Sequence, residues 1–301
     1  MTAMQPEQRP ARLAVGAIGA GRVGAVLLAA LARAGHRPVA ISAVSTASRR
    51  RAEALVPAAA TVAPDEVLGA CELVILAVPD DELDGLVGGL AASGRARPGT
   101  LVVHTSGAYG SGVLAPLTRV GCLPLALHPV MTFTGTAVDI ERLAGACFGV
   151  TAPEELRLAG EALVIEMGAE PVWIPESARP LYHAALAFGA NNLVTVVNVA
   201  ADLLADAGVD NPRRMLGPLV GAALDNALRQ GDTALTGPVA RGDAGTVRAH
   251  LDVLTESEPQ VRSAYVALAR LTALRALAAG TLPVERAEPL LDVLAERGGG
   301  A

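Results

Sequence analysis

Short apolar runs alternate with longer amphipathic stretches through the first 175 residues of the chain. This alternation is typical of a parallel β-sheet whose strands are connected by helices. The apolar runs are continuous rather than alternating, which indicates that both faces of the sheet are covered. We therefore predict an α/β fold with a doubly wound parallel sheet of the Rossmann type. The predicted strands cover residues 13–18, 39–44, 73–78, 100–104, 123–128, 147–151 and 170–174.

Helices are predicted between these strands, at residues 25–34, 49–55, 81–90 and 154–167. After Pro175 the strand pattern stops, and only helical stretches follow, at residues 181–207, 215–230, 244–256 and 260–279. We therefore predict two domains. The first domain holds the predicted sheet and covers residues 11–175, and the second is all-helical and covers residues 176–301.

Residues 13–32 are almost wholly apolar and follow two arginines, a composition that also occurs in signal peptides and membrane anchors. Arg22 interrupts this stretch, and its four glycines have the spacing of a turn. No small-residue cleavage site follows before Gly35. We therefore predict neither an export signal nor a membrane partner.

The composition is that of a globular protein, with 51% hydrophobic and 18% charged residues. The net charge of -6 argues against nucleic acid as a partner. The odd number of cysteines, Cys71, Cys122 and Cys147, gives no disulfide framework and fits a reducing cytoplasm. Every basic residue other than histidine is arginine, so no mechanism can use a lysine. No metal site is expected.

Gly19, Gly21 and Gly24 directly follow the first predicted strand and open a helix. In this context the G-x-G-x-x-G pattern is typical of a dinucleotide-binding loop. The first glycine permits the tight turn, the second lets the backbone approach the pyrophosphate, and the third lets the helix pack closely on the strand. The helix N-terminus then favours the anion. We predict that these glycines bind the cofactor together with Arg22 and Val23. Residues 11–175 are thus predicted to form a dinucleotide-binding Rossmann domain, which leaves residues 176–301 as the substrate and dimerisation domain.

The second predicted strand ends without an acidic residue. Enzymes that prefer NAD usually carry Asp or Glu there for the ribose 2′-hydroxyl, whereas residues 36–52 contain no acid. Ser45, Ser48 and Arg49 instead offer hydroxyls and a guanidinium group suited to a 2′-phosphate, and Arg50 and Arg51 follow directly. We therefore predict NADP as the cofactor, with a solvated helix start as the alternative explanation.

The strand predicted at residues 73–78 is followed by Pro79 and Asp80. We expect its last residue, Val78, and Pro79 to lie beside the nicotinamide half of the cofactor. Asp80 is expected to cap the next helix rather than to act in catalysis, because Asp is a common N-cap residue.

Polar residues follow two later strands, at the edge where open α/β sheets bind their ligands. The first strand ends in His104, with Ser106 in the next loop, and the second ends in His128. Among the five histidines only His183 has a comparable setting, near the start of the helix after the domain boundary. A histidine can donate and regain a proton near neutral pH. We predict His128 and His183 as candidate proton donors and leave open which one acts.

Four polar residues form one stripe along the helix predicted at residues 181–207. The stripe faces either the cleft or another helix, including one across a subunit interface. We expect Asn191, nearest the domain boundary, to face the cleft and to hold the substrate with Ser106. The other members, left open, are Thr195, Asn198 and Asp202.

The order of these motifs resembles a bacterial family described as Rossmann-like with a C-terminal domain of unknown function. A late segment also resembles that family's Gly-Pro-x-x-Arg-Gly-Asp pattern. The resemblance rests on the glycine loop, Val78-Pro79-Asp80, His104-Thr105-Ser106-Gly107, Leu127-His128-Pro129, Tyr182-His183 through Asn191, and Gly237 to Asp243.

More distantly, the chain is similar to the superfamily of pyrroline-5-carboxylate reductases, 3-hydroxyacid dehydrogenases and prephenate dehydrogenases, which implies hydride transfer. In 3-hydroxyisobutyrate-type enzymes a helix lysine works with an asparagine one turn later. Asn191 matches that asparagine, but Ala or Phe stands one turn before it. Prephenate dehydrogenases place a catalytic histidine in a His-Pro motif after the same strand, which favours His128 and brings Ser106 within reach of it. The resemblance also implies a homodimer paired through the helical domains.

We therefore expect an NADP-dependent oxidoreductase that transfers a hydride between NADPH and a small carbonyl or imine compound. Some members of the resembled family are thought to reduce ketopantoate, which makes a ketopantoate-type 2-keto acid the first specific substrate to consider. The alternatives are a prephenate-dehydrogenase-like enzyme and a non-catalytic NADP-binding regulator.

Overall fold

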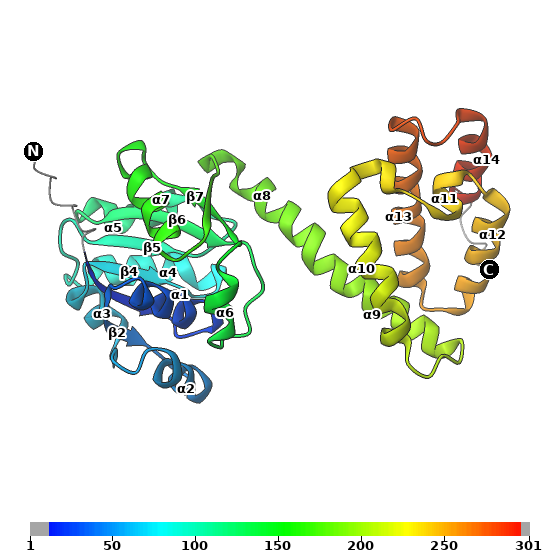
Figure 1. Ribbon diagram of the computed structural model, residues 1–301. Coiled ribbons are helices and arrows are strands. Elements are labelled where there is room, and N and C mark those ends of the chain that lie inside the picture. Colours follow the sequence, from blue (N-terminus) through cyan, green and yellow to red (C-terminus); the bar gives the residue numbers. More distant parts are fainter. Residues whose placement is uncertain (1–11, 296–301) are drawn as a thin grey trace, which may run out of the picture. The chain divides into compact units, whose positions relative to one another are not determined.

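The computed structural model describes residues 12–295, and the chain divides into two compact units (Figure 1). The first unit extends to Phe188, and the second begins at Gly189. The first unit holds the β-sheet, and the second is built from helices.

Eight strands form one sheet in the order β3-β2-β1-β4-β5-β6-β7-β8. Neighbouring strands run parallel except β6 and β7, which are antiparallel. The mostly parallel sheet with its helices confirms the predicted fold class, while the reversal at β7 is a departure that an apolar run cannot reveal, since it carries no direction. The strands are β1 (Ala14–Ile18), β2 (Arg37–Ser42), β3 (Ala60–Thr61), β4 (Leu73–Leu76), β5 (Leu101–His104), β6 (Leu123–Pro129), β7 (Cys147–Thr151) and β8 (Glu170–Trp173).

The strand register brings the carboxyl ends of the central strands to one edge. Ile18 of β1 lies opposite Leu76 of β4, and Leu76 lies opposite His104 of β5. His104 in turn lies opposite Ala126 of β6. The loops after β1, β4 and β5 and the last residues of β6 therefore follow one another along the carboxyl edge, where open α/β folds bind ligands.

Helices cover both faces of this sheet. Side chains of α1 and α7 belong to the core on one face, and those of α3, α4 and α5 belong to the core on the other. The helices of the first unit are α1 (Arg22–Arg33), α2 (Thr46–Leu55), α3 (Pro64–Ala70), α4 (Asp80–Ala92), α5 (Ala115–Arg119), α6 (Val138–Arg142), α7 (Arg157–Glu166) and α8 (Arg179–Leu186).

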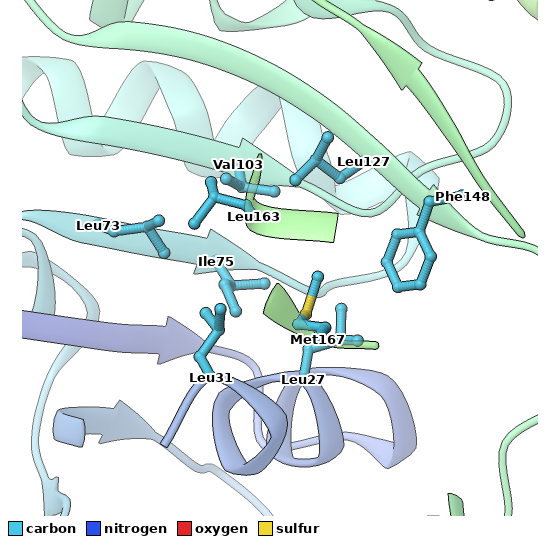
Figure 2. A pocket seen from close by; sticks show the side chains of 9 residues that line it. All are labelled: Leu27, Leu31, Leu73, Ile75, Val103, Leu127, Phe148, Leu163 and Met167. Carbon is cyan, nitrogen blue, oxygen red and sulfur yellow. The ribbon is translucent and has the colours of Figure 1, made fainter. Parts of the chain in front are cut away.

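The core between α1, α7 and the sheet is tightly filled (Figure 2). Leu27 and Leu31 of α1 lie near Ile75 of β4, and Leu163 of α7 and Met167 after it complete this layer. The cavity that remains among them is about 10 Å³, roughly the room of a single water. This packing fixes α1, and with it the glycine loop that precedes α1, against the sheet.

All seven strands predicted from the sequence are present, and their ends differ from the prediction by no more than two residues. The structure adds β3, α3, α5 and α6, which are too short to give a periodic signal. The apolar stretch at residues 13–32 forms β1, the glycine loop and most of α1. Its hydrophobicity is thus explained by burial in the core.

The division between the units lies beyond Pro175, where the change of pattern placed the boundary. Helix α8 begins at Arg179, whose guanidinium is buried against the sheet. A π-helical turn, Ala187–Asn191, follows α8 and contains the division. The end of the strand pattern therefore marks the last strand and not the end of the compact unit.

The second unit is all-helical, and its core lies between α12, α13 and α14. Gly242 ends α11 in the left-handed conformation, and Asp243 caps α12 by accepting from the Thr246 amide at 3.0 Å. The Arg-Gly-Asp part of the late pattern is thus a tight corner between two helices. The helices are α9 (Asn192–Asp206), α10 (Pro212–Gln230), α11 (Gly237–Arg241), α12 (Ala244–Val253), α13 (Pro259–Ala278) and α14 (Val284–Ala295).

One helical run within residues 12–295, Glu176–Asp206, is long and apolar enough to cross a membrane by length and composition. Only 6% of its apolar window is buried inside the chain. Exposed apolar side chains in this run include Leu181, Phe188 and Val194. A large exposed apolar face marks an interaction surface.

Candidate functional site

The glycine loop after β1 has a conformation that its sequence requires. Gly19 has φ +99°, and a Cβ there would lie 2.3 Å from the Ala77 carbonyl oxygen. A Cβ at Gly24 would lie 2.1 Å from the Gly19 carbonyl oxygen. The amides of Gly19 and Ala20 donate to the Ser42 carbonyl at the end of β2, at 3.2 and 2.9 Å. The turn therefore closes onto two neighbouring strands.

The space above this loop suits a pyrophosphate. Apart from Gly21 itself, its chain neighbours and the adjoining helix backbone, no heavy atom of residues 12–295 lies within 4 Å of the position that a Gly21 Cβ would take, so a ligand can approach the backbone there. Gly21 is also the N-cap of α1, where the first helical amides have no partner within the helix and the helix dipole favours an anion. The open backbone and the helix start fit the dinucleotide predicted from the sequence.

Arg51 is the arginine that reaches the glycine loop. Its Nη1 donates to the Ala20 carbonyl at 3.0 Å. A Cβ at Gly135, in the loop after β6, would lie 2.6 Å from Arg51 Nε and 2.8 Å from Arg22 Cγ. Arg22 and Arg51 therefore lie side by side beside the loop. Arg49, the arginine that the sequence favoured, is exposed on α2.

The serines before these arginines cap α2. Ser45 Oγ accepts from the Ser48 amide at 3.1 Å, and Ser48 Oγ donates to the Ser45 carbonyl at 2.8 Å. These bonds hold both hydroxyls at the start of α2, which is where a 2′-phosphate site would need them. Capping of the helix by itself also explains why serines stand there.

A buried carboxylate shapes the loop around Gly135. Asp139 accepts from the amides of Thr134 and Gly135, at 2.8 and 2.7 Å, and from the Thr134 hydroxyl at 3.0 Å. Burial alone would raise the pKa of Asp139, but these hydrogen bonds outweigh it and lower the pKa. The charged Asp139 thus holds Gly135 against the two arginines.

Val78 and Pro79 follow β4 along the carboxyl edge, beside the glycine loop. Pro79 is the N-cap of α4, and Asp80 is the first residue within that helix. The expectation that Asp80 forms the N-cap is therefore wrong by one position. In the first turn its carboxylate still interacts favourably with the helix dipole.

His128, His183 and Tyr182 form one cluster near the end of β6. The Tyr182 hydroxyl lies 2.8 Å from His128 Nδ1. The rings of His128 and His183 meet edge to face, with centroids 6.1 Å apart. A Cβ at Gly107 would lie 2.7 Å from His183 Cδ2 and 3.0 Å from His128 Nε2. The β5 loop, β6 and α8 thus bring both predicted histidines together, and Gly107 makes room for them.

Ser106 shapes the loop that carries Gly107. It is buried, and its Oγ accepts from the amides of Ala108 and Tyr109 at 3.2 and 3.3 Å. Its carbonyl accepts from Arg179 at 3.3 Å. A role for Ser106 in holding substrate stays a prediction, beside this role in the loop.

Arg179 is a buried cation that the sequence analysis missed. Its Nε donates to Thr151 Oγ1 at 2.8 Å and its Nη1 to the Ser106 carbonyl. Its Nη2 donates to the carbonyls of Ala126 and Gly149, at 3.1 and 2.9 Å. These partners are all neutral and do not compensate the guanidinium charge. The charge therefore lowers the pKa of nearby ionisable groups such as His104 and His128.

Two histidines near this charge, the buried His104 and the half-buried His128, are shifted toward the neutral form. Burial lowers the pKa of His128 to about 4, and the charges of Arg179 and His183 add to the effect. Burial also lowers the pKa of His104 to about 4, although its bond to the Gly110 carbonyl opposes the shift. Both imidazoles are therefore neutral at neutral pH.

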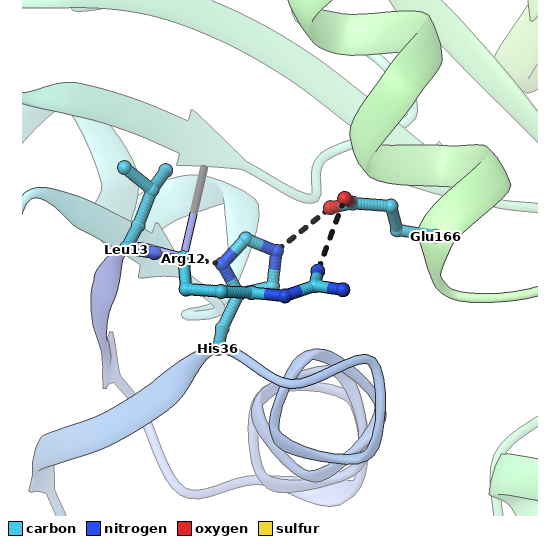
Figure 3. Close-up of polar contacts among 4 residues, drawn as sticks. All are labelled: Arg12, Leu13, His36 and Glu166. Atoms are coloured by element: carbon cyan, nitrogen blue, oxygen red, sulfur yellow. Dashed lines mark hydrogen bonds and ion pairs between the residues drawn. The ribbon is translucent and has the colours of Figure 1, made fainter. Parts of the chain in front are cut away.

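Three of the five histidines have structural partners. His104 accepts from the Ser106 amide at Nδ1 and donates to the Gly110 carbonyl from Nε2, at 3.2 and 2.8 Å. His36 lies at the opposite edge of the sheet, where Nδ1 accepts from the Leu13 amide and Nε2 lies 2.7 Å from Glu166 (Figure 3). His250 pairs with Tyr265 in the second unit.

Asn191 belongs to the second unit and is exposed at the end of the π-helical turn. Its place in the cleft stays a prediction. Two other members of the stripe lie beside neighbouring helices. Thr195 lines a groove between α9 and α13, and Asn198 accepts from Arg213 of α10 at 3.3 Å.

The fold and this edge together define a Rossmann-like protein with a helical second unit. In agreement, residues 2–129 match the model of the Rossmann-like domain, and residues 146–272 match that of the domain of unknown function DUF2520. The chain therefore carries a Rossmann-like domain followed by a C-terminal DUF2520 domain, as the motifs predicted. No curated protein matches its sequence.

Solved structures share this fold at low identity. A Bacteroides fragilis protein provisionally described as an NADP oxidoreductase is 24% identical, with a TM-score of 0.72 over 87% of this chain and 98% of its own. An imine reductase from Pseudomonas sp. is 20% identical, with a TM-score of 0.63 over 94% and 100%. A Plasmodium falciparum pyrroline carboxylate reductase with NADP bound is 11% identical, with a TM-score of 0.54 over 88% and 98%.

Proposed function

We propose that this protein is an NADP-dependent oxidoreductase that acts on a small carbonyl or imine compound. One observation carries the proposal: a single sheet edge holds both the open glycine loop and the cluster of His128 and His183. The cofactor loop and the proton-handling groups thus lie along one edge, with the ends of β4 and β5 between them, which is the arrangement that a dinucleotide extended along this edge would need for hydride transfer. This class also fits the similar structures reported above, which are a protein provisionally described as an NADP oxidoreductase, an imine reductase and a pyrroline carboxylate reductase.

NADPH, when bound, supplies the hydride. Gly19 to Gly24 would hold its pyrophosphate, Arg22 and Arg51 its 2′-phosphate, and Val78 and Pro79 its nicotinamide half. The histidine cluster hydrogen-bonds the carbonyl or imine and provides the proton that completes the reduction. Ser106 and Asn191 are proposed to hold the rest of the substrate. A 2-keto acid of the ketopantoate type is the first carbonyl to test, and a cyclic imine the first C=N compound.

The test is NADPH oxidation across a panel of 2-keto acids and cyclic imines, with NADPH affinity measured in parallel by calorimetry. We expect His128→Asn and His183→Asn to reduce turnover by roughly 10²- to 10⁴-fold while NADPH affinity is retained, because general acid catalysis contributes about that much. Binding of NADPH without turnover of any panel member would favour the non-catalytic regulator instead. A histidine whose replacement leaves turnover intact has only a packing role.

The proposal includes a cytoplasmic homodimer formed through the second unit. Apolar side chains on three of its helices are exposed in the single chain, and a groove of about 450 Å³ lies between α9 and α13. A second copy would cover this surface, as the resemblance implies. The exposed side chains are Leu193, Val194 and Val196 of α9, Met215, Leu219, Leu224 and Leu228 of α10, and Leu268, Leu271 and Leu274 of α13.

A further inference from the structure

The Tyr182 hydroxyl is hydrogen-bonded to one of the two ring nitrogens of His128. It lies 2.8 Å from Nδ1, and the two rings meet edge to face with centroids 5.6 Å apart. A neutral imidazole carries its proton on one nitrogen only. The direction of this hydrogen bond therefore decides whether Nε2, beside Gly107 and His183, is a donor or an acceptor.

The surroundings of Tyr182 favour the hydroxyl as the donor. The backbone of Gly149 acts on the phenol oxygen in the direction that lowers the pKa of Tyr182. His128 Nδ1 lies within hydrogen-bond distance of the hydroxyl and is the acceptor available for its proton. Burial raises the pKa of Tyr182, in part against the charge of Arg179, so the hydroxyl keeps its proton. A Cβ at Gly149 would lie 2.5 Å from the hydroxyl oxygen. The glycine in β7 is thus what allows the hydroxyl to reach its position.

The charges around the ring keep it neutral. The groups that face His128 are the guanidinium of Arg179 from α8, the imidazole of His183 from α8 and that of His104 from β5. Each is a cation or can become one, and no carboxylate is among them. A second proton on His128 is therefore disfavoured whichever of its neighbours is charged.

We propose that Tyr182 is a positioning residue that holds His128 as its neutral Nε2–H tautomer, and that His183 is the histidine that releases the proton. This inference rests on the proposed function and divides its chemistry between the two histidines. As a hydride from NADPH forms the new C–H bond, the C=O π electrons move to the oxygen. The oxygen accepts a hydrogen bond from His128 Nε2 and takes the proton of the His183 imidazolium, which leaves an alcohol, neutral His183 and NADP⁺.

The tautomer can be read without any turnover, by ¹⁵N NMR of the full-length protein labelled at histidine. We expect His128 to show a protonated Nε2 and an unprotonated Nδ1, and Tyr182→Phe to mix the two tautomers. The chain offers a matched control, because the Tyr265 hydroxyl lies 2.8 Å from His250 Nδ1 with the same edge-to-face geometry. Tyr265→Phe should therefore change the signals of His250 and leave those of His128 unchanged.

A second variant tests the position of the hydroxyl while keeping the tyrosine. Gly149→Ala displaces the hydroxyl and should change the His128 signals in the same way as Tyr182→Phe. A protonated Nδ1 in the unchanged protein, or His128 signals that are the same in Tyr182→Phe, would overturn the inference.

Kinetics separate this inference from the proposed function. With an active substrate, Tyr182→Phe should reduce kcat by roughly 10- to 100-fold, as expected for one misdirected hydrogen bond, and leave the Kd for NADPH unchanged. Tyr265→Phe should leave kcat unchanged. If the expected tautomers are found but no panel compound is turned over, the tautomer assignment is supported and the proposed function fails. If turnover is found and Tyr182→Phe retains full kcat, the positioning role fails alone.

Discussion

A buried guanidinium with neutral hydrogen-bond partners changes the protonation of the groups around it. Arg179 donates to three carbonyls and one hydroxyl. Burial is the main cause of the low pKa of His104 and His128, and the Arg179 charge lowers both further. In the sequence this arginine stands at the start of a helix, between Ala178 and Pro180, where arginine is normally solvated. Only the folding of α8 onto the sheet makes it a buried cation, so no sequence pattern reveals it.

Because His104 and His128 are neutral in the folded protein, we expect the first unit to become less stable to unfolding at acidic pH. Each titrates near pH 4 when folded, against an ordinary value of 6.5. Between these values the unfolded chain binds more protons, so stability is lost as the pH falls through this window. One pKa unit corresponds to about 1.4 kcal/mol, so each histidine contributes a loss of up to about 3 kcal/mol.

Urea unfolding between pH 7 and pH 4 measures this loss. The single tryptophan, Trp173 in β8, reports on the first unit through its fluorescence. His104→Asn should be less stable at pH 7 and lose less stability on acidification, because one of the two titrating groups is gone. A pH dependence identical to that of the unchanged protein would contradict the role of His104.

At the scale of elements, the sequence predicted what depends on local pattern. The continuous apolar runs identified seven strands, and the glycine spacing identified the loop after β1. The short β3 and α6 and the antiparallel direction of β7 were missed, because they depend on contacts distant in sequence. For the site, His128 and His183 were predicted together, whereas Arg179 and Tyr182 acquire their importance only through α8.

The predicted preference for NADP over NAD depends on the arginines of helix α2. Arg51 reaches the glycine loop, while Arg49 and Arg50 are exposed. We expect Arg51→Ala to weaken NADPH binding by roughly 10- to 100-fold, since a charge-assisted contact contributes about 1.5 to 3 kcal/mol. NADH, which lacks the 2′-phosphate, should be affected far less. Calorimetric titration with both cofactors measures the difference.

The matched controls are Arg49→Ala and Arg50→Ala on the same helix. If Arg51 is the main contact, both controls should change the preference for NADPH over NADH less than Arg51→Ala does. Equal weakening of NADPH and NADH in Arg51→Ala would instead mean that the arginine supports the loop through the Ala20 carbonyl alone. An unchanged protein that binds NADH as tightly as NADPH would overturn the choice of NADP.

At the scale of the whole molecule, the exposed apolar helices are the surface on which the proposed homodimer would form. The helical run Glu176–Asp206 is mostly exposed, and α10 and α13 add further apolar side chains. Burying such side chains contributes about 25 cal/mol per Å² of apolar surface. Covering these helices with a second copy of the chain would therefore strongly stabilise the dimer relative to two separate monomers. A lipid bilayer is the competing cover for an apolar run of this length.

Leu219 provides the sharpest test of the dimer, because it lies on α10 with 68% of its surface exposed. A charge placed there would be buried without a partner in a dimer but would stay solvated in a monomer. Leu219→Glu should therefore shift the molar mass measured by light scattering from dimer to monomer. Leu158→Glu is the matched control, since Leu158 lies on α7 of the first unit and is 78% exposed, and it should leave the dimer intact. A monomeric unchanged protein, or one that floats with phospholipid vesicles, would refute the homodimer.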